Sequence, residues 1–247
     1  MVACVAQIAG GAAPVVIGLC LFAAGLAHGA GDEQQDAIRP FGLLHAGAYV
    51  AVGLAFAGLF LAAPVAGLAL FLALSAWHFA RTECGFARSS RLAIASLATG
   101  GSVLFRPTET AAIFTGITGM VIPAPMLAIL ALVGAGGAAL AGLAALRGDA
   151  GRLPALLALA ATAVLHPVLA VGVIFLTGHA LPVQKRQLAR YGTDAVWRAS
   201  AVPTLVALAG AAMLVAATTA GLLATAVAAA LGIGLATPHM LTERLER

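Results

Sequence analysis

Long apolar stretches, separated by short polar segments, run through the whole chain. A bilayer core about 30 Å thick requires roughly 20 apolar residues in a helix, and most of the stretches approach or exceed that length. Only helices and closed barrels satisfy the backbone in lipid, and the short alternating segments of a barrel are missing. The stretches are 3–28, 41–62, 64–82, 90–105, 109–125, 126–146, 153–181, 199–218 and 220–241.

This pattern predicts an all-α, polytopic transmembrane helix bundle of about eight to nine spans, with residues 1–247 forming a single integral membrane domain. The region 109–146 allows two interpretations: two short spans, or a re-entrant segment followed by one span. Composition agrees with a membrane protein, because 62% of the residues are hydrophobic and 9% are charged. Soluble domains have roughly 45–50% apolar and about 25% charged residues.

The thirteen basic residues lie mainly in the polar junctions, which argues against a nucleic-acid partner despite a net charge of +4. With nine spans, ten basic residues fall on the side reached after odd-numbered spans, and Arg106, Arg147 and Arg152 fall on the other. The ten are Arg39, Arg81, Arg88, Arg91, Lys185, Arg186, Arg190, Arg198, Arg244 and Arg247. By the positive-inside rule, we expect the N-terminus outside and the C-terminus in the cytoplasm.

Four of the six histidines lie at or near the C-terminal ends of apolar stretches that finish on the cytoplasmic side. They are His28, His78, His179 and His239. An imidazole at membrane depth is costly unless a partner or a metal compensates it, and imidazole is a common ligand for iron, copper and zinc. The pattern predicts a metal site near the cytoplasmic face.

Two further polar residues are candidates for the same site. If the chain stays helical after His28, then Asp32 lies on the same face and its carboxylate can orient the imidazole. His166 lies thirteen residues before His179, about 20 Å along a continuous helix and on roughly the opposite face. It is therefore either an alternative ligand or a polar group paired with a kinked backbone. His45 has no partner motif, and we assign it to packing or to hydrogen bonds around the site.

The ordered set of short motifs resembles the Brp/Blh family, the bacterial and archaeal β-carotene 15,15′-dioxygenases. The motifs are HGAGDE (28–33), SAWHF (75–79), HP…F…GH (166–179) and TPHM (237–240). The resemblance implies a non-haem Fe(II) centre held by histidines. It also implies cleavage of the central double bond of β-carotene by O2, giving two molecules of retinal. By position, His28, His78 and His179 match iron-ligand histidines of the family.

This chain departs from the family pattern at one position. The family typically carries a second histidine one helical turn after the one that matches His179, and this chain has Val183 there. The fourth ligand is therefore open: His239 is the best replacement by topology, His166 is the next, and a three-histidine site completed by water or Asp32 is the third alternative. The departure is also compatible with another substrate or with an inactive member.

The aromatic residues Trp77, Phe79 and Phe175 are candidates to line a pocket for an apolar polyene that enters from the lipid. Ordinary packing or an interfacial aromatic belt is the competing interpretation. Two other classes of protein also fit the histidines. A haem- or quinone-binding electron-transfer subunit would use paired histidines on facing helices, and a transporter or non-catalytic polytopic protein would use them for proton relay or packing. The symmetry of inverted repeats that many transporters show is not evident.

Overall fold

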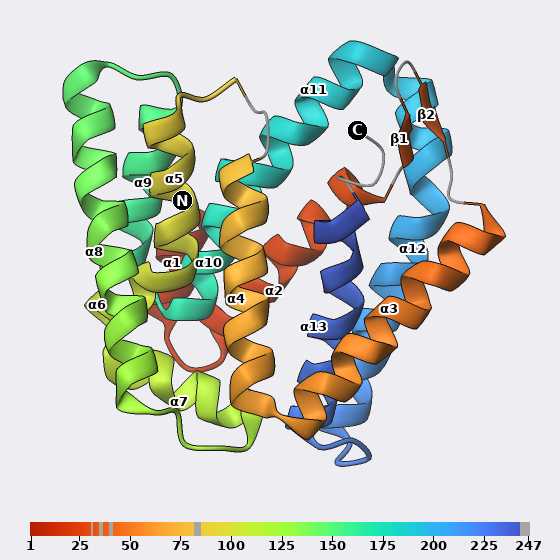
Figure 1. The fold of residues 1–247 in the computed structure, drawn as a ribbon, viewed down its shortest axis with the longest axis horizontal. Helices are drawn as coiled ribbons and strands as arrows, with labels where there is room; N and C mark the ends of the chain where they lie inside the picture. The colour runs from red at the N-terminus through yellow and green to blue at the C-terminus, as the bar shows by residue number, and fades with distance from the viewer. Residues whose placement is uncertain (31, 35–36, 40–41, 82–84, 243–247) are drawn as a thin grey trace. The chain divides into compact units, whose positions relative to one another are not determined.

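The computed structural model describes residues 1–30, 32–34, 37–39, 42–81 and 85–242. The chain divides into two units that alternate along the sequence; Figure 1 labels the helices and strands along the chain. Unit 1 comprises Met1–Gly25, Ser75–Ile113 and Ile122–Val183, and unit 2 comprises Leu26–Leu74, Phe114–Val121 and Gln184–Arg247. Several helices therefore pass from one unit into the other, and each unit is described below by itself.

The described part of the chain is helical except for one short antiparallel hairpin. The elements up to Arg81 are α1 (Val2–Ala9), α2 (Ala13–Gly25), the 3-10 turn η1 (Leu26–Gly29), β1 (Asp32–Gln34), β2 (Ala37–Arg39), α3 (Leu43–Ala62) and α4 (Pro64–Arg81). There follow α5 (Arg88–Ser96), the π-helical turn η2 (Leu97–Gly101), α6 (Ser102–Phe105), α7 (Pro107–Thr118), α8 (Ala124–Arg147) and α9 (Arg152–Val164). The remaining elements are α10 (Pro167–Phe175), the π-helical turn η3 (Leu176–Ala180), α11 (Leu181–Tyr191), α12 (Thr193–Thr219) and α13 (Thr225–Thr242).

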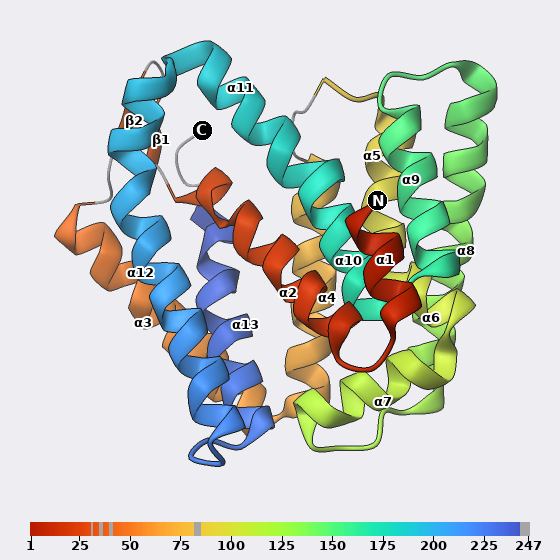
Figure 2. The same cartoon turned by 180° about the vertical axis from the view of Figure 1, so that it is seen from behind.

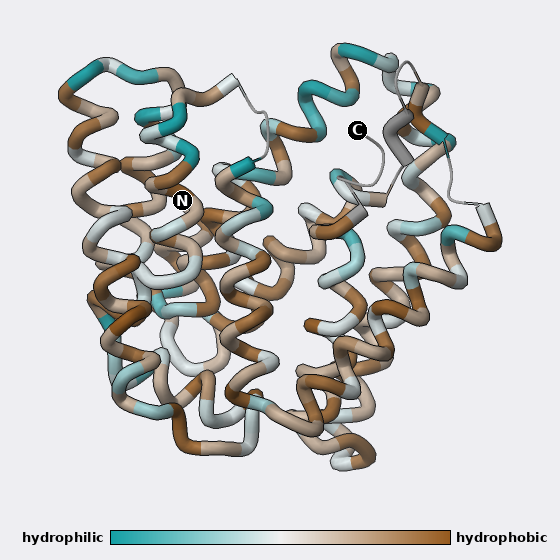
Figure 3. The backbone as a smooth tube through the Cα atoms, viewed as in Figure 1, coloured by the Kyte–Doolittle hydropathy of each residue, from teal (hydrophilic) through white to brown (hydrophobic). Residues whose placement is uncertain are grey.

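Within the described residues, five helices are long and apolar enough to cross a membrane. They are Leu43–Ala62, Pro64–Arg81, Ala124–Arg147, Pro167–Tyr191 and Thr193–Thr219. Figure 3 shows apolar positions along most of the helices and hydrophilic ones mainly towards helix ends and turns. The predicted all-α class is confirmed, and these five helices suggest a membrane protein; eight to nine spans and the sides of the two termini remain predictions.

The stretch 3–28 is not one helix, contrary to the prediction. Gly10 and Gly11 adopt φ values of 64° and 55°, a left-handed conformation that glycine reaches without steric cost. The chain turns there, so that α1 and α2 are separate helices. Ala6 of α1 packs in one apolar cluster with Leu165 and Leu169, against which Ile17 and Leu21 of α2 also pack.

The stretch 153–181 is also divided, because α9 ends at Val164 and a new helix starts at Pro167. The break is stabilised by hydrogen bonds. The backbone N–H of His166 donates to Gln7 Oε1 at 2.6 Å, and the N–H of Val168 donates to His166 Nδ1 at 3.3 Å. From Pro167 the chain is helical for 25 residues. His179 therefore lies in the middle of a helical segment and not at its end, which corrects the prediction.

The region 109–146 contains one long helix. α7 has 12 residues, about 18 Å at 1.5 Å per residue, which is too short to cross the core. α8 has 24 residues, enough for one span. The structure therefore supports one span in this region, preceded by a short helix.

The helix boundaries in unit 1 correct the side of the membrane that the sequence predicts for Arg147 and Arg152. In unit 1 the Ala87 N–H donates to the Ala150 carbonyl at 2.9 Å, and the Ser89 hydroxyl donates to the Asp149 carboxylate. The start of α5 and the α8–α9 turn therefore lie at the same end of the unit. Arg147 and Arg152 flank this turn, so they share that end with Arg88 and Arg91, and the prediction that separates them is wrong.

Arg106 lies at the opposite end of unit 1, where its guanidinium donates to the Val164 carbonyl at 2.9 Å and pairs with Glu109 at 2.7 Å. The charge asymmetry within this unit is thus stronger than the sequence count indicates, with Arg88, Arg91, Arg147 and Arg152 at one end and Arg106 at the other.

Close helix crossings in each unit depend on glycine. In unit 1, α2 and α10 lie side by side (Figure 2), and a Cβ on Gly172 would be 2.7 Å from the carbonyl oxygen of Gly18. In unit 2, α3 and α13 cross where a Cβ on Gly234 would be 2.5 Å from the Gly53 carbonyl oxygen. Small residues that allow backbones to approach closely are typical of helix packing in membranes.

Candidate metal centre

In unit 1, two buried histidines face each other. His78 lies in the last turn of α4, and His179 lies in the π-helical turn η3. Their Nε2 atoms are 2.9 Å apart, and both side chains are almost fully buried. A π-turn changes the direction of side chains relative to a regular helix and is frequent at functional sites. Gly178 allows the π-helical turn η3 to pack closely against α5, because a Cβ there would be 2.9 Å from the Ile94 side chain.

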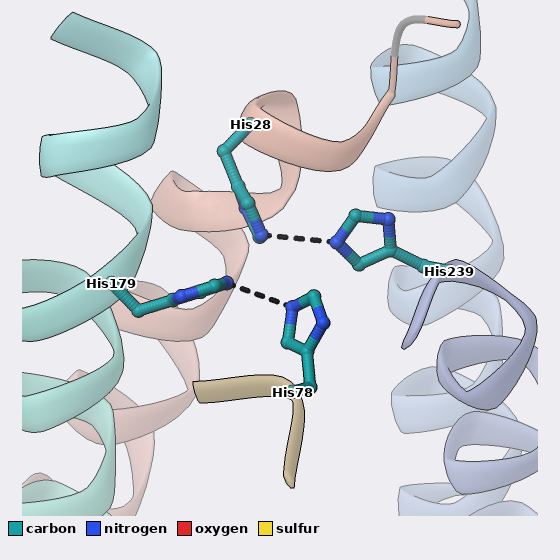
Figure 4. A group of neighbouring side chains, drawn as sticks. All are labelled: His28, His78, His179 and His239. Atoms are coloured by element: carbon teal, nitrogen blue, oxygen red, sulfur yellow. Dashed lines mark hydrogen bonds between the residues drawn. The ribbon is translucent and has the colours of Figure 1, made fainter. Parts of the chain in front are cut away.

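In unit 2, the other two histidines form a second pair. His28 is in η1 and His239 is in α13, and their Nε2 atoms are 3.2 Å apart. His28 is buried and His239 is half-buried. Gly29 makes room for the pair, since a Cβ there would be 2.3 Å from Cε1 of His239. Figure 4 shows each pair with the contact between its two imidazoles.

The backbones that carry the second pair are held by buried or half-buried polar side chains. Gln187 Nε2 donates to the main-chain carbonyl of His28 at 2.9 Å. The backbone N–H of His239 forms a hydrogen bond with the phenol oxygen of Tyr49. Sequence reasoning missed both residues. The only available signals were that Tyr49 lies one helical turn after His45 and that Gln187 lies about two turns after His179.

Aromatic rings surround the first pair within unit 1. The ring of Phe79 is 4.7 Å from the His179 imidazole, and that of Phe175 is 6.0 Å from it, measured between centroids. Phe22 of α2 stacks on Phe175 at 5.2 Å, a neighbour that sequence reasoning also missed. Trp77 lies beneath the Arg81 guanidinium, 5.7 Å from its carbon atom.

The four histidines could hold a metal ion. Two nitrogens bound to one cation at about 2.1 Å, with an angle of 90–109° between them, are about 3.0–3.4 Å apart. The separations of 2.9 and 3.2 Å within the two pairs are close to this range. All donors in this group are imidazoles, which suits iron, copper, zinc or nickel better than magnesium or calcium.

The family model for beta-carotene 15,15′-dioxygenase matches residues 19–245. The chain belongs to this family. No curated protein and no solved structure matches the chain.

The resemblance to the β-carotene dioxygenase family predicts a histidine at the position that Val183 occupies. Val183 is 1% exposed and lies in α11, one helical turn after His179. An apolar side chain therefore fills the position in this chain. His239, the replacement that the sequence favours, is paired with His28 in unit 2.

The other predicted site residues lie elsewhere. His166 is the N-cap of α10, at the other end of that helix from His179. His45 is in the first turn of α3, half-buried and one turn before Tyr49. Asp32 is in β1, where its backbone pairs with that of Arg39. The expectation that His28 and Asp32 share a helix face is therefore wrong, and the Asp32 side chain lies outside the described part of the structure.

Proposed function

We propose that the chain is a membrane-embedded, iron-dependent dioxygenase that cleaves the central 15,15′ double bond of β-carotene or a related carotenoid. Both atoms of O2 enter the product: the carbon–carbon double bond breaks, each of its two carbons gains one oxygen atom, and two molecules of retinal form. Membership of the family and the two buried histidine pairs support this proposal.

We further propose that His28, His78, His179 and His239 bind one Fe(II) ion together. The chain passes between the two units after Gly25, after Leu74 and after Val183. Each crossing lies within five residues of one of the first three histidines, and consecutive Cα atoms are at most about 3.8 Å apart. These short covalent links support a shared metal. Asp32 remains the alternative for completing the ligand set. His166 lies at the other end of α10 from His179, so we do not propose it as a ligand.

Bound Fe(II) would supply coordination positions for O2, because neutral imidazole ligands leave them open and leave the metal its positive charge. The protein's residues have separate roles. The four imidazoles hold the ion, and Gly29 leaves the space that the His28–His239 pair needs. Phe79 and Phe175 present apolar rings beside His179, which favours contact with a hydrocarbon polyene and disfavours water. We propose that Trp77, which lies beneath the Arg81 guanidinium, lines the substrate pocket together with these rings.

We place the protein in the bacterial inner membrane, with the metal near the cytoplasmic face, so that an apolar substrate enters laterally from the lipid. The concentration of arginine at one end of unit 1 supports this orientation under the positive-inside rule.

The decisive experiment is expression of the chain in a β-carotene-producing bacterium, with loss of colour and formation of retinal measured by chromatography. We expect His28→Ala, His78→Ala and His179→Ala each to abolish cleavage, because each removes a ligand. His45→Ala is the control and should keep most of the activity. Unchanged turnover in His179→Ala would contradict the ligand set, and a Soret band in the purified protein would contradict a non-haem site.

The fourth ligand is tested by a rescue experiment. His239→Ala should strongly weaken iron binding by the purified protein, because it removes one of the four ligands. Adding Val183→His to that variant places an imidazole one turn after His179, where the family has one, and should restore part of the binding. Full iron binding in His239→Ala alone would show that His239 is not a ligand.

A further inference from the structure

Gln187 is exceptional among the polar residues of α11. These residues are Gln184, Lys185, Arg186, Gln187 and Arg190. Only Gln187 is buried, with 3% of its surface exposed. It lies in unit 2, eight residues after His179 along the chain. Burial of an amide is costly unless both of its polar atoms find partners.

The nitrogen of this amide has a specific partner. It donates to the backbone carbonyl of His28 at 2.9 Å, across 159 positions of sequence. His28 is near the end of η1, and carbonyls at a helix end lack amide donors from their own helix. Gln187 supplies that donor. It therefore fixes the stretch of backbone from which the His28 imidazole projects.

The oxygen of the same amide is buried, and no donor reaches it from the part of the chain that the structure describes. The amide cannot be turned over to change this, because only its NH2 group can donate to the His28 carbonyl. Buried acceptors normally have a partner in the protein or in ordered water. β-Carotene is a hydrocarbon without hydrogen-bond donors, so the substrate does not provide one.

We propose that Gln187 is a positioning residue of the metal centre: its amide nitrogen holds the backbone of His28, and its amide oxygen accepts a hydrogen bond from one retained water. This inference rests on the proposed function in two respects: it takes His28 as a metal ligand and a hydrocarbon as the substrate. Gln187 acts through His28 and does not itself bind the metal.

The test is a Co(II) titration of the purified, metal-free, full-length protein, followed by the visible absorption of the bound metal. We expect Gln187→Leu to weaken Co(II) binding about tenfold, as is typical when a residue that orients a ligand is lost. Gln187→Glu keeps the shape but loses the N–H donor, so it should weaken binding similarly. Gln184→Leu, the same substitution at a half-buried position on the same helix, should leave the affinity unchanged.

A double-mutant cycle separates positioning from other roles. In a His28→Ala background, Gln187→Leu should cause no further loss of Co(II) affinity. An equal loss in both backgrounds would mean that Gln187 acts independently of His28, and would overturn the proposal. Lower thermal stability with unchanged affinity would overturn it too. An experimental structure with a protein donor on Oε1 would exclude the water. Failure of the wild-type protein to bind Co(II) would instead contradict the proposed function.

Discussion

Among single residues, Gly29 is decisive for the His28–His239 pair because it has no side chain. A Cβ on Gly29 would overlap three atoms of the His239 ring, the nearest at 2.3 Å. We therefore expect Gly29→Ala to displace the imidazole and to lower the affinity for Co(II) by about tenfold or more. Gly47→Ala is the matched control, because a Cβ there meets nothing within 4 Å. Equal affinities of the two variants would contradict the expected overlap.

His166 should make stability depend on pH. Burial lowers the pKa of this imidazole below its ordinary value of 6.5, the charge of Arg106 lowers it further, and Glu109 opposes the shift. The unfolded chain therefore binds the proton more readily than the folded protein. The stabilisation is present above about pH 6.5 and is lost as the pH falls below it. Protonation also removes the Nδ1 acceptor used by the Val168 N–H.

Asparagine caps helices without titrating, so it isolates this effect. Thermal unfolding of wild type and His166→Asn in detergent, from about pH 7.5 to about pH 5.5, should show a smaller loss of the unfolding temperature in the variant. The same loss in both proteins would mean that protonation of His166 does not affect stability.

At the scale of elements, the crossing of α3 and α13 sets the position of His239. A Cβ on Gly234 would be 2.5 Å from the Gly53 carbonyl oxygen, and backbone atoms cannot easily move away. We expect Gly234→Ala to destabilise the protein by about 1–3 kcal/mol, as forced overpacking does. Gly232→Ala lies on the same helix and meets nothing within 4 Å. Denaturation of both variants in detergent measures the difference, and equal stability would refute the close crossing.

Helix boundaries were predictable where the signal is local. The prolines and the lengths of the apolar stretches place α3 and α4 within two residues of their ends. The break between α9 and α10 was missed, because apolar residues flank Leu165-His166-Pro167 on both sides. The backbone N–H of His166 at this break donates to the side chain of Gln7, 159 positions away. No periodicity in the sequence encodes such a contact.

The site could be predicted in part for a similar reason. Buried histidines in an apolar chain are conspicuous, so the four candidates were named from sequence. Which histidine pairs with which depends on how the helices pack. Tyr49 and Gln187 were missed because they bind the main chain of His239 and His28. Every residue has those main-chain atoms, so no motif marks their partners.

At the scale of the whole molecule, orientation in the membrane can be measured directly. α8 has 24 residues and is about 36 Å long, so Ala124 and Ala150 are expected at opposite faces. Both are exposed. In a background without Cys4, Cys20 and Cys84, an impermeant maleimide added to spheroplasts should label Ala124→Cys but not Ala150→Cys, because the arginine-rich end faces the cytoplasm. The reverse labelling would invert the orientation.

The nested order of the histidine pairs has a consequence for biosynthesis. The inner pair joins residues 101 positions apart, and the outer pair joins residues 211 positions apart. During translation His28 emerges early, yet its partner is made only when α13 is nearly finished. Ribosome stalling or premature termination after His179 but before that point yields a chain that has three of the four imidazoles and lacks the outer pair. The chain can therefore offer all four imidazoles to a metal only when its synthesis is almost complete.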